Sequence, residues 1–102
     1  MTPKLAKETP EALVSAYTTV DKLADALKDP RTENVAREEL IKRGNKAYEG
    51  GDWKDAAANY NPVHEHLNKK EKKTPGEISE FTMVGIKLSR AEDELEKKNL
   101  GI

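Results

Sequence analysis

Apolar residues recur three and four positions apart in four stretches of the chain, the spacing that puts side chains on one face of a helix. The spacing predicts helices over residues 10–28, 30–49, 53–67 and 75–99. The last of these has a regular apolar stripe: Ile78, Phe81, Val84, Leu88, Ala91 and Leu95. No stretch alternates apolar and polar residues as a strand would. The pattern therefore predicts an all-α protein.

Helix boundaries are indicated by proline and glycine. All five prolines follow Thr, Asp or Asn, and such a pair suits the start of a helix, where the polar side chain caps a free N–H and proline needs none. Asp29-Pro30 is thus expected to end the first helix and to cap the second. Thr74 with Glu77 three residues later predicts a capping box. Gly50-Gly51 is expected to end the second helix, and Asp52 to cap the third.

Pro62 interrupts the third helical pattern. A proline inside a helix removes a backbone hydrogen bond and clashes with the preceding turn, at a cost of about 3 kcal/mol. We favour a continuous helix with a kink at Pro62. The alternative is that Asn61 caps a new helix at this point.

Composition fits one small helical domain of residues 1–102, with a flexible N-terminus at 1–9. Hydrophobic residues make up 35% of the chain and charged residues 36%, so the core is expected to be slender. The net charge of −1 lacks the positive excess that attracts phosphate backbones, so nucleic acid is not expected as a partner. Without cysteine, an apolar leader or a stretch of roughly 20 apolar residues, the sequence favours a cytoplasmic protein that does not contact membranes.

The most informative segment runs from Leu40 to Tyr60. A small residue, a Gly-Asp-aromatic turn, and a second small residue followed four positions later by an aromatic occur in it at Gly44, Gly51-Asp52-Trp53, Ala56 and Tyr60. In this respect residues 35–67 resemble a tetratricopeptide repeat, a helical hairpin of 34 residues. The resemblance implies that the second and third helices cross closely at Gly44, with the first and fourth as flanking layers of a four-helix array.

The resemblance also implies a binding surface, because ligands of this family lie along the concave face of the first helix of each repeat. The residues expected on that face are Glu38, Ile41, Asn45, Tyr48 and Glu49. Asn45 matches an asparagine of family members that grip a peptide C-terminus, but Ile41 replaces their lysine, so such binding is not predicted. For Ile41 and Tyr48, packing in the core is an equally good interpretation.

Residues that might carry chemistry have simpler interpretations. His64 and His66 are two positions apart and point in different directions on a helix, unlike a zinc pair. The lysines at 69–73 and the acidic residues at 92–96 are interpreted as solvated surfaces. Neither a nucleophile motif nor a phosphate-binding loop occurs, so we expect no enzyme activity, cofactor or metal.

Together these features favour a non-catalytic protein-binding module, a small adaptor or regulatory subunit whose partner is another protein or a peptide segment. Two alternatives fit the same composition. One is a helical inhibitor or immunity-type protein that covers the active site of an enzyme. The other is an assembly component that forms homodimers through an exposed apolar stripe, since a single helical hairpin does not bury its own faces.

Overall fold

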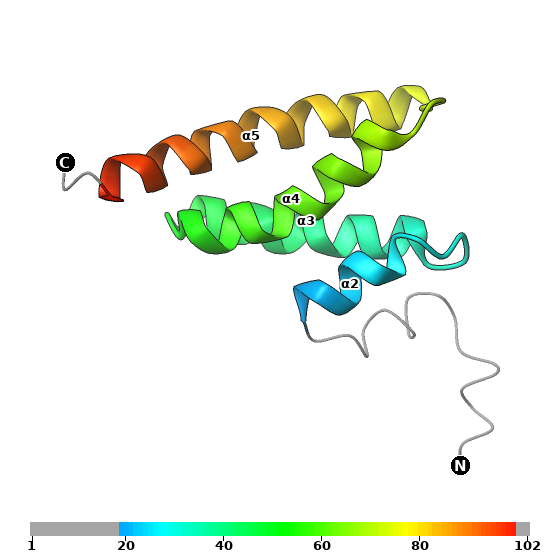
Figure 1. The fold of residues 1–102 in the computed structure, drawn as a ribbon, viewed down its shortest axis with the longest axis horizontal. Coiled ribbons are helices and arrows are strands. Elements are labelled where there is room, and N and C mark those ends of the chain that lie inside the picture. Colours follow the sequence, from blue (N-terminus) through cyan, green and yellow to red (C-terminus); the bar gives the residue numbers. More distant parts are fainter. Residues whose placement is uncertain (1–18, 100–102) are drawn as a thin grey trace, which may run out of the picture.

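The computed structural model describes residues 19–99, and in this part of the chain the fold is a compact array of helices without strands. The helices are α2 (Val20–Ala26), α3 (Glu33–Glu49), α4 (Trp53–Lys69) and α5 (Pro75–Asn99). Figure 1 shows α4 crossing between α3 and α5, with α2 beside α3. Among residues 19–99, none of the helices is long and apolar enough to cross a lipid bilayer. The predicted flexible segment 1–9 lies outside the described residues.

The core forms where α4 packs against its neighbours. Tyr60, Val63 and Leu67 of α4 are completely buried, because they follow one another at the three-and-four spacing of a single helix face. The other buried apolar residues come from every described helix: Leu23, Ala26, Leu27, Ala36, Leu40, Ala56, Val84, Leu88 and Ala91. The predicted apolar faces thus supply most of this core.

The first two helix starts differ from the sequence-based expectation. Thr19 has extended backbone and its hydroxyl accepts a hydrogen bond from Lys22 N, so α2 begins at Val20 and a single helix over 10–28 is wrong. Residues 10–18 of that predicted helix lie outside the described residues. The start predicted at Pro30 is also wrong, because the Asp29 carboxylate accepts from Arg31 N within a turn. Helix α3 starts three residues later, at Glu33, and the Thr32 hydroxyl donates to Ala26 O instead of capping the helix.

The turn between α3 and α4 has the predicted glycine and aspartate chemistry. Gly51 has a φ of 77°, in the left-handed region that glycine adopts without strain. This conformation lets Asp52 N donate to Ala47 O at 2.9 Å, which closes the end of α3. The Asp52 carboxylate in turn accepts from Asp55 N at 3.1 Å and caps α4, as expected.

Helix α4 continues through Pro62 to Lys69, so the alternative of a new helix capped by Asn61 is wrong. Proline removes only its own hydrogen bond to the carbonyl one turn earlier. Tyr60, two positions before Pro62, and Val63, directly after it, are fully buried. Their packing favours continuation of the helix across the missing bond.

Thr74 and Glu77 form the predicted capping box at the start of α5. Glu77 N donates to Thr74 Oγ1 at 3.1 Å, and Thr74 N donates to Glu77 Oε1 at 2.9 Å. The Glu77 side chain is buried in this arrangement. It occupies the inward face of the first turn, where Ile78 was expected, and Ile78 is 52% exposed. The predicted inclusion of Ile78 in the buried stripe is therefore wrong.

Gly44 is buried where α3 and α4 cross, as the sequence predicts. A Cβ atom at this position would lie 2.5 Å from Cε1 of Tyr60 and 2.7 Å from Cδ1. Because the Tyr60 ring has no exposed surface, it has no open space into which it could move. Absence of a side chain at Gly44 thus permits the close packing of an aromatic ring against the α3 backbone.

We predict that Gly44→Ala lowers the free energy of unfolding by about 1–3 kcal/mol, the usual cost of overpacking a core, and that Gly44→Leu lowers it further. Chemical denaturation monitored by circular dichroism measures both. Gly76→Ala is the matched control, because a Cβ there meets only Thr74 Oγ1 at 3.9 Å. The control should be neutral or stabilising by up to about 1 kcal/mol. A neutral Gly44→Ala would contradict the tight contact with Tyr60.

Candidate functional site

One shallow groove of about 400 Å³ runs along the outer side of α3 and is bounded by α5. Four of the five binding residues expected from sequence line it, namely Glu38, Ile41, Asn45 and Glu49. They share this surface because successive members are three or four positions apart on α3. The remaining lining residues are Lys42 and Lys46 of α3 and Glu80 of α5.

The groove has a partly buried floor and a charged rim. Ile41 and Asn45 are half-buried, whereas Glu38, Lys42, Lys46 and Glu49 are exposed. Along α3 the rim therefore has acidic side chains at its two ends, Glu38 and Glu49, and two basic side chains between them, Lys42 and Lys46. Glu80 carries no free charge to the groove, because its Oε1 accepts a hydrogen bond from Arg37 Nε at 2.6 Å.

Asn45 has a structural role that the sequence did not predict. Its Oδ1 accepts a hydrogen bond from the hydroxyl of Tyr60 at 2.5 Å and another from Lys87 Nζ at 3.2 Å. Burial, together with Tyr48 and Glu49 nearby, raises the pKa of Tyr60 to about 12, so the hydroxyl stays a donor at neutral pH. Asn45 therefore accepts a hydrogen bond from a buried side chain of the core in addition to lining the groove.

Tyr48 is not among the groove residues. Its ring lies edge-on to Trp53, at a centroid distance of 5.3 Å and an interplanar angle of 86°, and 6.4 Å from the Tyr60 ring. Lys87 Nζ lies 5.3 Å from the centroid of the Tyr48 ring. Packing against the core, the alternative stated for Tyr48 and Ile41, thus describes both residues, and Ile41 also lines the groove.

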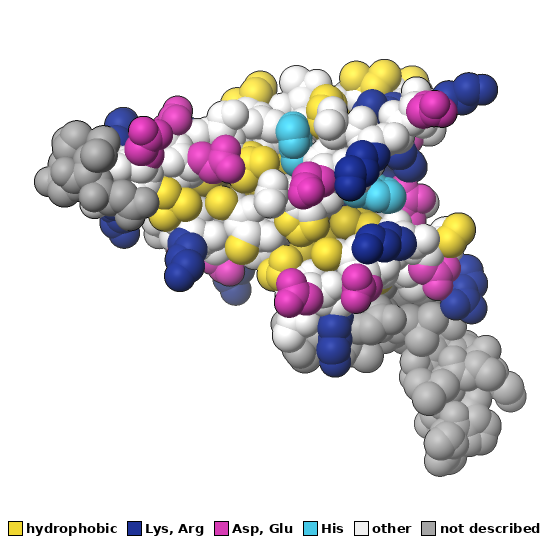
Figure 2. Space-filling view, in the orientation of Figure 1, with side chains coloured by type: hydrophobic (Ala, Val, Ile, Leu, Met, Phe, Trp, Pro, Cys, Tyr) yellow, Lys and Arg dark blue, Asp and Glu magenta, His cyan; other side chains and the backbone are white. Residues whose placement is uncertain are grey.

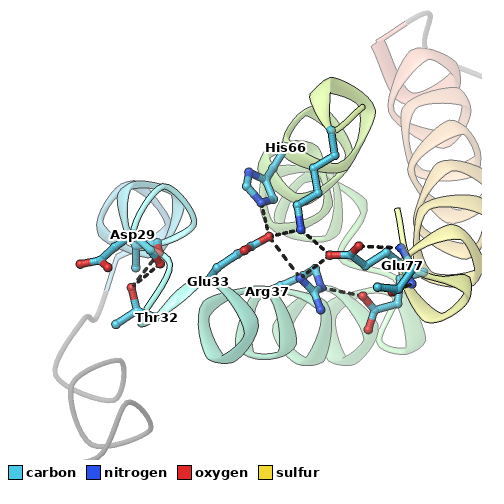
Figure 3. A network of polar contacts seen from close by, with 10 residues as sticks. Asp29, Thr32, Glu33, Arg37, His66 and Glu77 are labelled. Carbon is cyan, nitrogen blue, oxygen red and sulfur yellow. Dashed lines mark hydrogen bonds and ion pairs between the residues drawn. The ribbon is translucent and has the colours of Figure 1, made fainter. Parts of the chain in front are cut away.

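A second polar site joins three helices (Figure 3). Arg37 of α3 is only 7% exposed, and its Nη1 lies 3.6 Å from carboxylate oxygens of Glu33 and of Glu77. Its Nε bonds to Glu80. Leaving Arg37 or Glu77, the two buried members, without a counter-charge costs about 3–5 kcal/mol, so these two depend on their partners.

Two further residues complete this buried ion cluster: His66 of α4 and Lys70, which directly follows α4. Lys70 Nζ lies 2.6 Å from Glu33 Oε2 and also pairs with Glu77. His66 Nε2 lies 2.8 Å from the same oxygen of Glu33. The interpretation of residues 69–73 as a solvated run is therefore wrong for Lys70, because Glu33 and Glu77 draw its side chain inward.

The pKa values within the cluster fit a role in folding. Hydrogen bonds from Lys70 and from Thr74 N lower the pKa of Glu77 to about 2. Burial raises the pKa of Glu33, but hydrogen bonds from Lys70 and His66 outweigh it and lower the pKa overall. The same contacts with Glu33 and Glu77 raise the pKa of Lys70. Each of these pKa shifts favours the charged form of its own side chain, as expected for groups that pair with an opposite charge.

His64 and His66 have separate neighbours, as their spacing predicts. His64 stacks on Phe81 of α5, with ring centroids 4.7 Å apart and an interplanar angle of 16°. His66 contacts Glu33 of α3. Within residues 19–99, no three His, Asp or Glu side chains are grouped to hold a metal ion. The histidines thus connect α4 to different helices.

The sequence did contain a signal for the buried ion cluster. Glu33, Arg37, Leu40 and Gly44 follow one another at helical spacing, and Leu40 and Gly44 are buried. A charged residue on the buried face of a predicted helix requires a partner of opposite charge. The identity of that partner was not predictable, because Glu80 lies 43 residues away in the chain.

The lowered pKa of Glu77 generates a prediction for acid stability. A carboxylate whose pKa is lower in the folded state stabilises the fold above its unfolded value of about 4.5, and this contribution is lost as the pH falls toward about 2. We expect a loss of about 1–3 kcal/mol over this interval, since one pKa unit corresponds to about 1.4 kcal/mol and solvent screens part of it.

Urea denaturation at a series of pH values, for the wild type and for Glu77→Gln, measures this contribution. The variant should be less stable at pH 7 and should lose less stability between pH 4.5 and 2. Glu92→Gln, on the exposed face of α5, is the matched control and should follow the wild type. Parallel pH profiles for the wild type and Glu77→Gln would be evidence against the predicted role.

The bond between Asn45 and Tyr60 generates a second prediction. Asn45→Ala leaves the Tyr60 hydroxyl without this acceptor and should lower the free energy of unfolding by about 1–3 kcal/mol. The double change Asn45→Ala and Tyr60→Phe removes both partners and should be less destabilising than the sum of the two single changes. Denaturation of all four proteins gives the coupling energy. Additive effects would show that the bond contributes nothing.

Comparison of the chain with protein-family models, with curated proteins and with solved structures gave no significant match. No activity or partner is therefore transferred from a relative.

Proposed function

We propose that this chain is a non-catalytic protein-binding module whose groove along α3 receives a short segment of another protein. One observation carries the proposal: four residues selected from the sequence as a binding face line a single groove. The groove also combines an apolar contact at Ile41 with exposed charges at Glu38 and Glu49.

The form of the groove favours a polypeptide over a small molecule. Small-molecule sites are usually enclosed and mostly apolar, with few polar groups. This groove is shallow, and most of its lining side chains are charged. A polypeptide makes many moderate contacts along an open surface, and complementary charges fix its position.

The position of titratable groups supports a non-catalytic role. Active sites usually gather groups whose pKa values are shifted toward the needs of a reaction. Among the described residues, the strongest carboxylate shift belongs to Glu77, which is buried between Thr74, Arg37 and Lys70 and is not part of the groove lining. That shift is explained by the structural pairing of charges.

The hairpin of α3 and α4 supports the further proposal of a tetratricopeptide-like architecture. Gly44 packs against Tyr60, Gly51 and Asp52 form the turn, and Ala56 is buried, as that resemblance implies. Ligands of that family lie along the first helix of each hairpin. Helix α3 is the first helix here, and α5 follows the hairpin and bounds the same groove.

The charges of the rim define the chemistry of the segment. Glu38 and Glu49 are eleven residues apart, about 16 Å along a helix, and Lys42 and Lys46 lie between them. An extended polypeptide covers this distance with about five residues at 3.3 Å each. The complementary segment therefore has a basic residue toward each end, an acidic residue near its middle and an apolar side chain for Ile41.

Selection from a random peptide library against the purified protein tests the proposal, followed by titration calorimetry with the enriched peptide. The double change Glu38→Lys and Glu49→Lys should weaken binding about 3- to 30-fold, since each exposed ion pair contributes up to about 1 kcal/mol. A peptide whose basic residues are replaced by glutamate should regain affinity for this double variant.

Glu71→Lys is the matched control, because Glu71 is exposed in the loop before α5 and does not line the groove. It should leave the affinity unchanged. Melting curves for each variant separate binding from folding. Peptides that bind the wild type and the double variant equally, or a library from which nothing is enriched, would exclude the groove as the binding site.

A further inference from the structure

The outward face of α5 carries an apolar strip that no other described helix covers. Ile86 is 66% exposed and Ile78 is 52% exposed, and they are the two large hydrophobic residues that are exposed in the described part of the chain. A shallow hollow of about 450 Å³ follows this face and is lined by residues of α5 alone: Ile78, Ser79, Thr82, Met83, Ile86 and Lys87. Figure 2 shows hydrophobic side chains along the upper edge of the molecule, which α5 forms.

The exposure of this strip follows from how α5 packs. Glu77, Val84, Leu88 and Ala91 are buried and hold the inner face of the helix toward α4. Ile78 and Ile86 are left exposed on the other side of the helix, and Figure 1 shows α5 at one edge of the array. The two isoleucines lie about two turns apart with Met83 between them in the same hollow, and contiguous exposed apolar surface of this kind can mark a contact surface.

The strip has the symmetry of a self-complementary surface. Ile78 and Ile86 each lie four residues from Thr82, about 6 Å along the helix on either side. If a second α5 packs antiparallel to the first with a twofold axis at Thr82, Ile78 of each copy contacts Ile86 of the other copy. Such an isologous contact uses the same patch on both chains.

Exposed charges on the two sides of Thr82 favour the same arrangement. Lys72 is exposed in the loop before α5, whereas Glu92 and Asp93 are exposed near its other end. Asp93 lies about 16 Å from Thr82 along the helix. Lys72 lies three residues before the start of α5, about 10–20 Å from Thr82 in the opposite direction. In this register Lys72 of one copy lies toward Glu92 and Asp93 of the other, and the exposed Lys97 and Lys98 of the last turn lie farther from the axis. Figure 2 shows acidic side chains gathered toward the C-terminal end of α5.

We propose that a second copy of this chain covers the outward face of α5, as an antiparallel homodimer with Thr82 on the twofold axis. The groove beside α3 stays open in this dimer, because α5 contributes Glu80 to that groove and Glu80 is not part of the Ile78–Ile86 hollow. The dimer would thus present two grooves.

Engineered disulfides test the register directly, since the chain has no cysteine of its own. On the axis, Thr82→Cys lies opposite its own copy and should form a covalent dimer on mild oxidation, because packed helices bring facing Cα atoms within the 4.4–6.8 Å that a disulfide needs. Ser89→Cys is the control: it is exposed, but seven residues from the axis, so its two copies lie about 20 Å apart and should not react.

A mixture of Ile78→Cys and Ile86→Cys proteins should give more cross-linked dimer than either protein alone. Equal cross-linking at positions 82 and 89 would overturn the antiparallel register. Sedimentation equilibrium of the unmodified chain gives an independent result. A monomeric mass at every concentration up to the millimolar range would overturn the dimer, whether or not another protein binds this face.

Charge exchange separates a specific dimer from general adhesion. Lys72→Glu should weaken dimerisation about 3- to 30-fold because symmetry repeats the pair twice, and adding Asp93→Lys to the same chain should restore it. The double change Ile78→Glu and Ile86→Glu should give a monomer whose circular dichroism spectrum is unchanged. Failure of Asp93→Lys to restore the affinity would contradict the proposed register.

Discussion

The position of α5 depends on a buried ion cluster in which three carboxylates surround Arg37. Glu33, Glu77 and Glu80 come from two helices, and Lys70 and His66 supply additional positive or polar contacts from a third part of the chain. A misplaced helix would leave a charge buried without its partner, which costs more than the loss of an ordinary apolar contact. Charge pairing therefore adds to the apolar packing of α5 against α4 and disfavours arrangements of α5 that separate these charges.

The same cluster connects the fold to both proposed surfaces. Glu80 neutralises Arg37 and also bounds the groove beside α3. Glu77 turns inward to cap its own helix and to meet Lys70, and its neighbour Ile78 is consequently left outside. The rotation of α5 about its own axis thus places Glu80 at the groove and the apolar strip on the outside.

Sequence patterns predicted the features that depend on neighbouring residues. The capping box of Thr74 and Glu77, the left-handed Gly51 and the cap at Asp52 all involve residues within a few positions, and each occurs as predicted. Four of the five residues that the tetratricopeptide resemblance placed on a binding face likewise line the groove. The wrong starts of α2 and α3 have local causes, whereas the errors at Lys70 and Asn45 arose where distant parts of the chain meet. The inward turn of Lys70 depends on Glu33, which periodicity along one helix does not reveal, and the bond of Asn45 depends on Tyr60 of another helix.

The central place of α4 also bears on how the chain folds. Its principal packing partners, α3 and α5, are its immediate neighbours in sequence, while α3 and α5 touch each other only slightly. Folding can therefore proceed by closing one short helical hairpin and then the next, without first joining distant ends of the chain. Proteins dominated by such local contacts fold in microseconds to milliseconds. Little time is then available for the exposed apolar edges of a half-formed chain to associate wrongly.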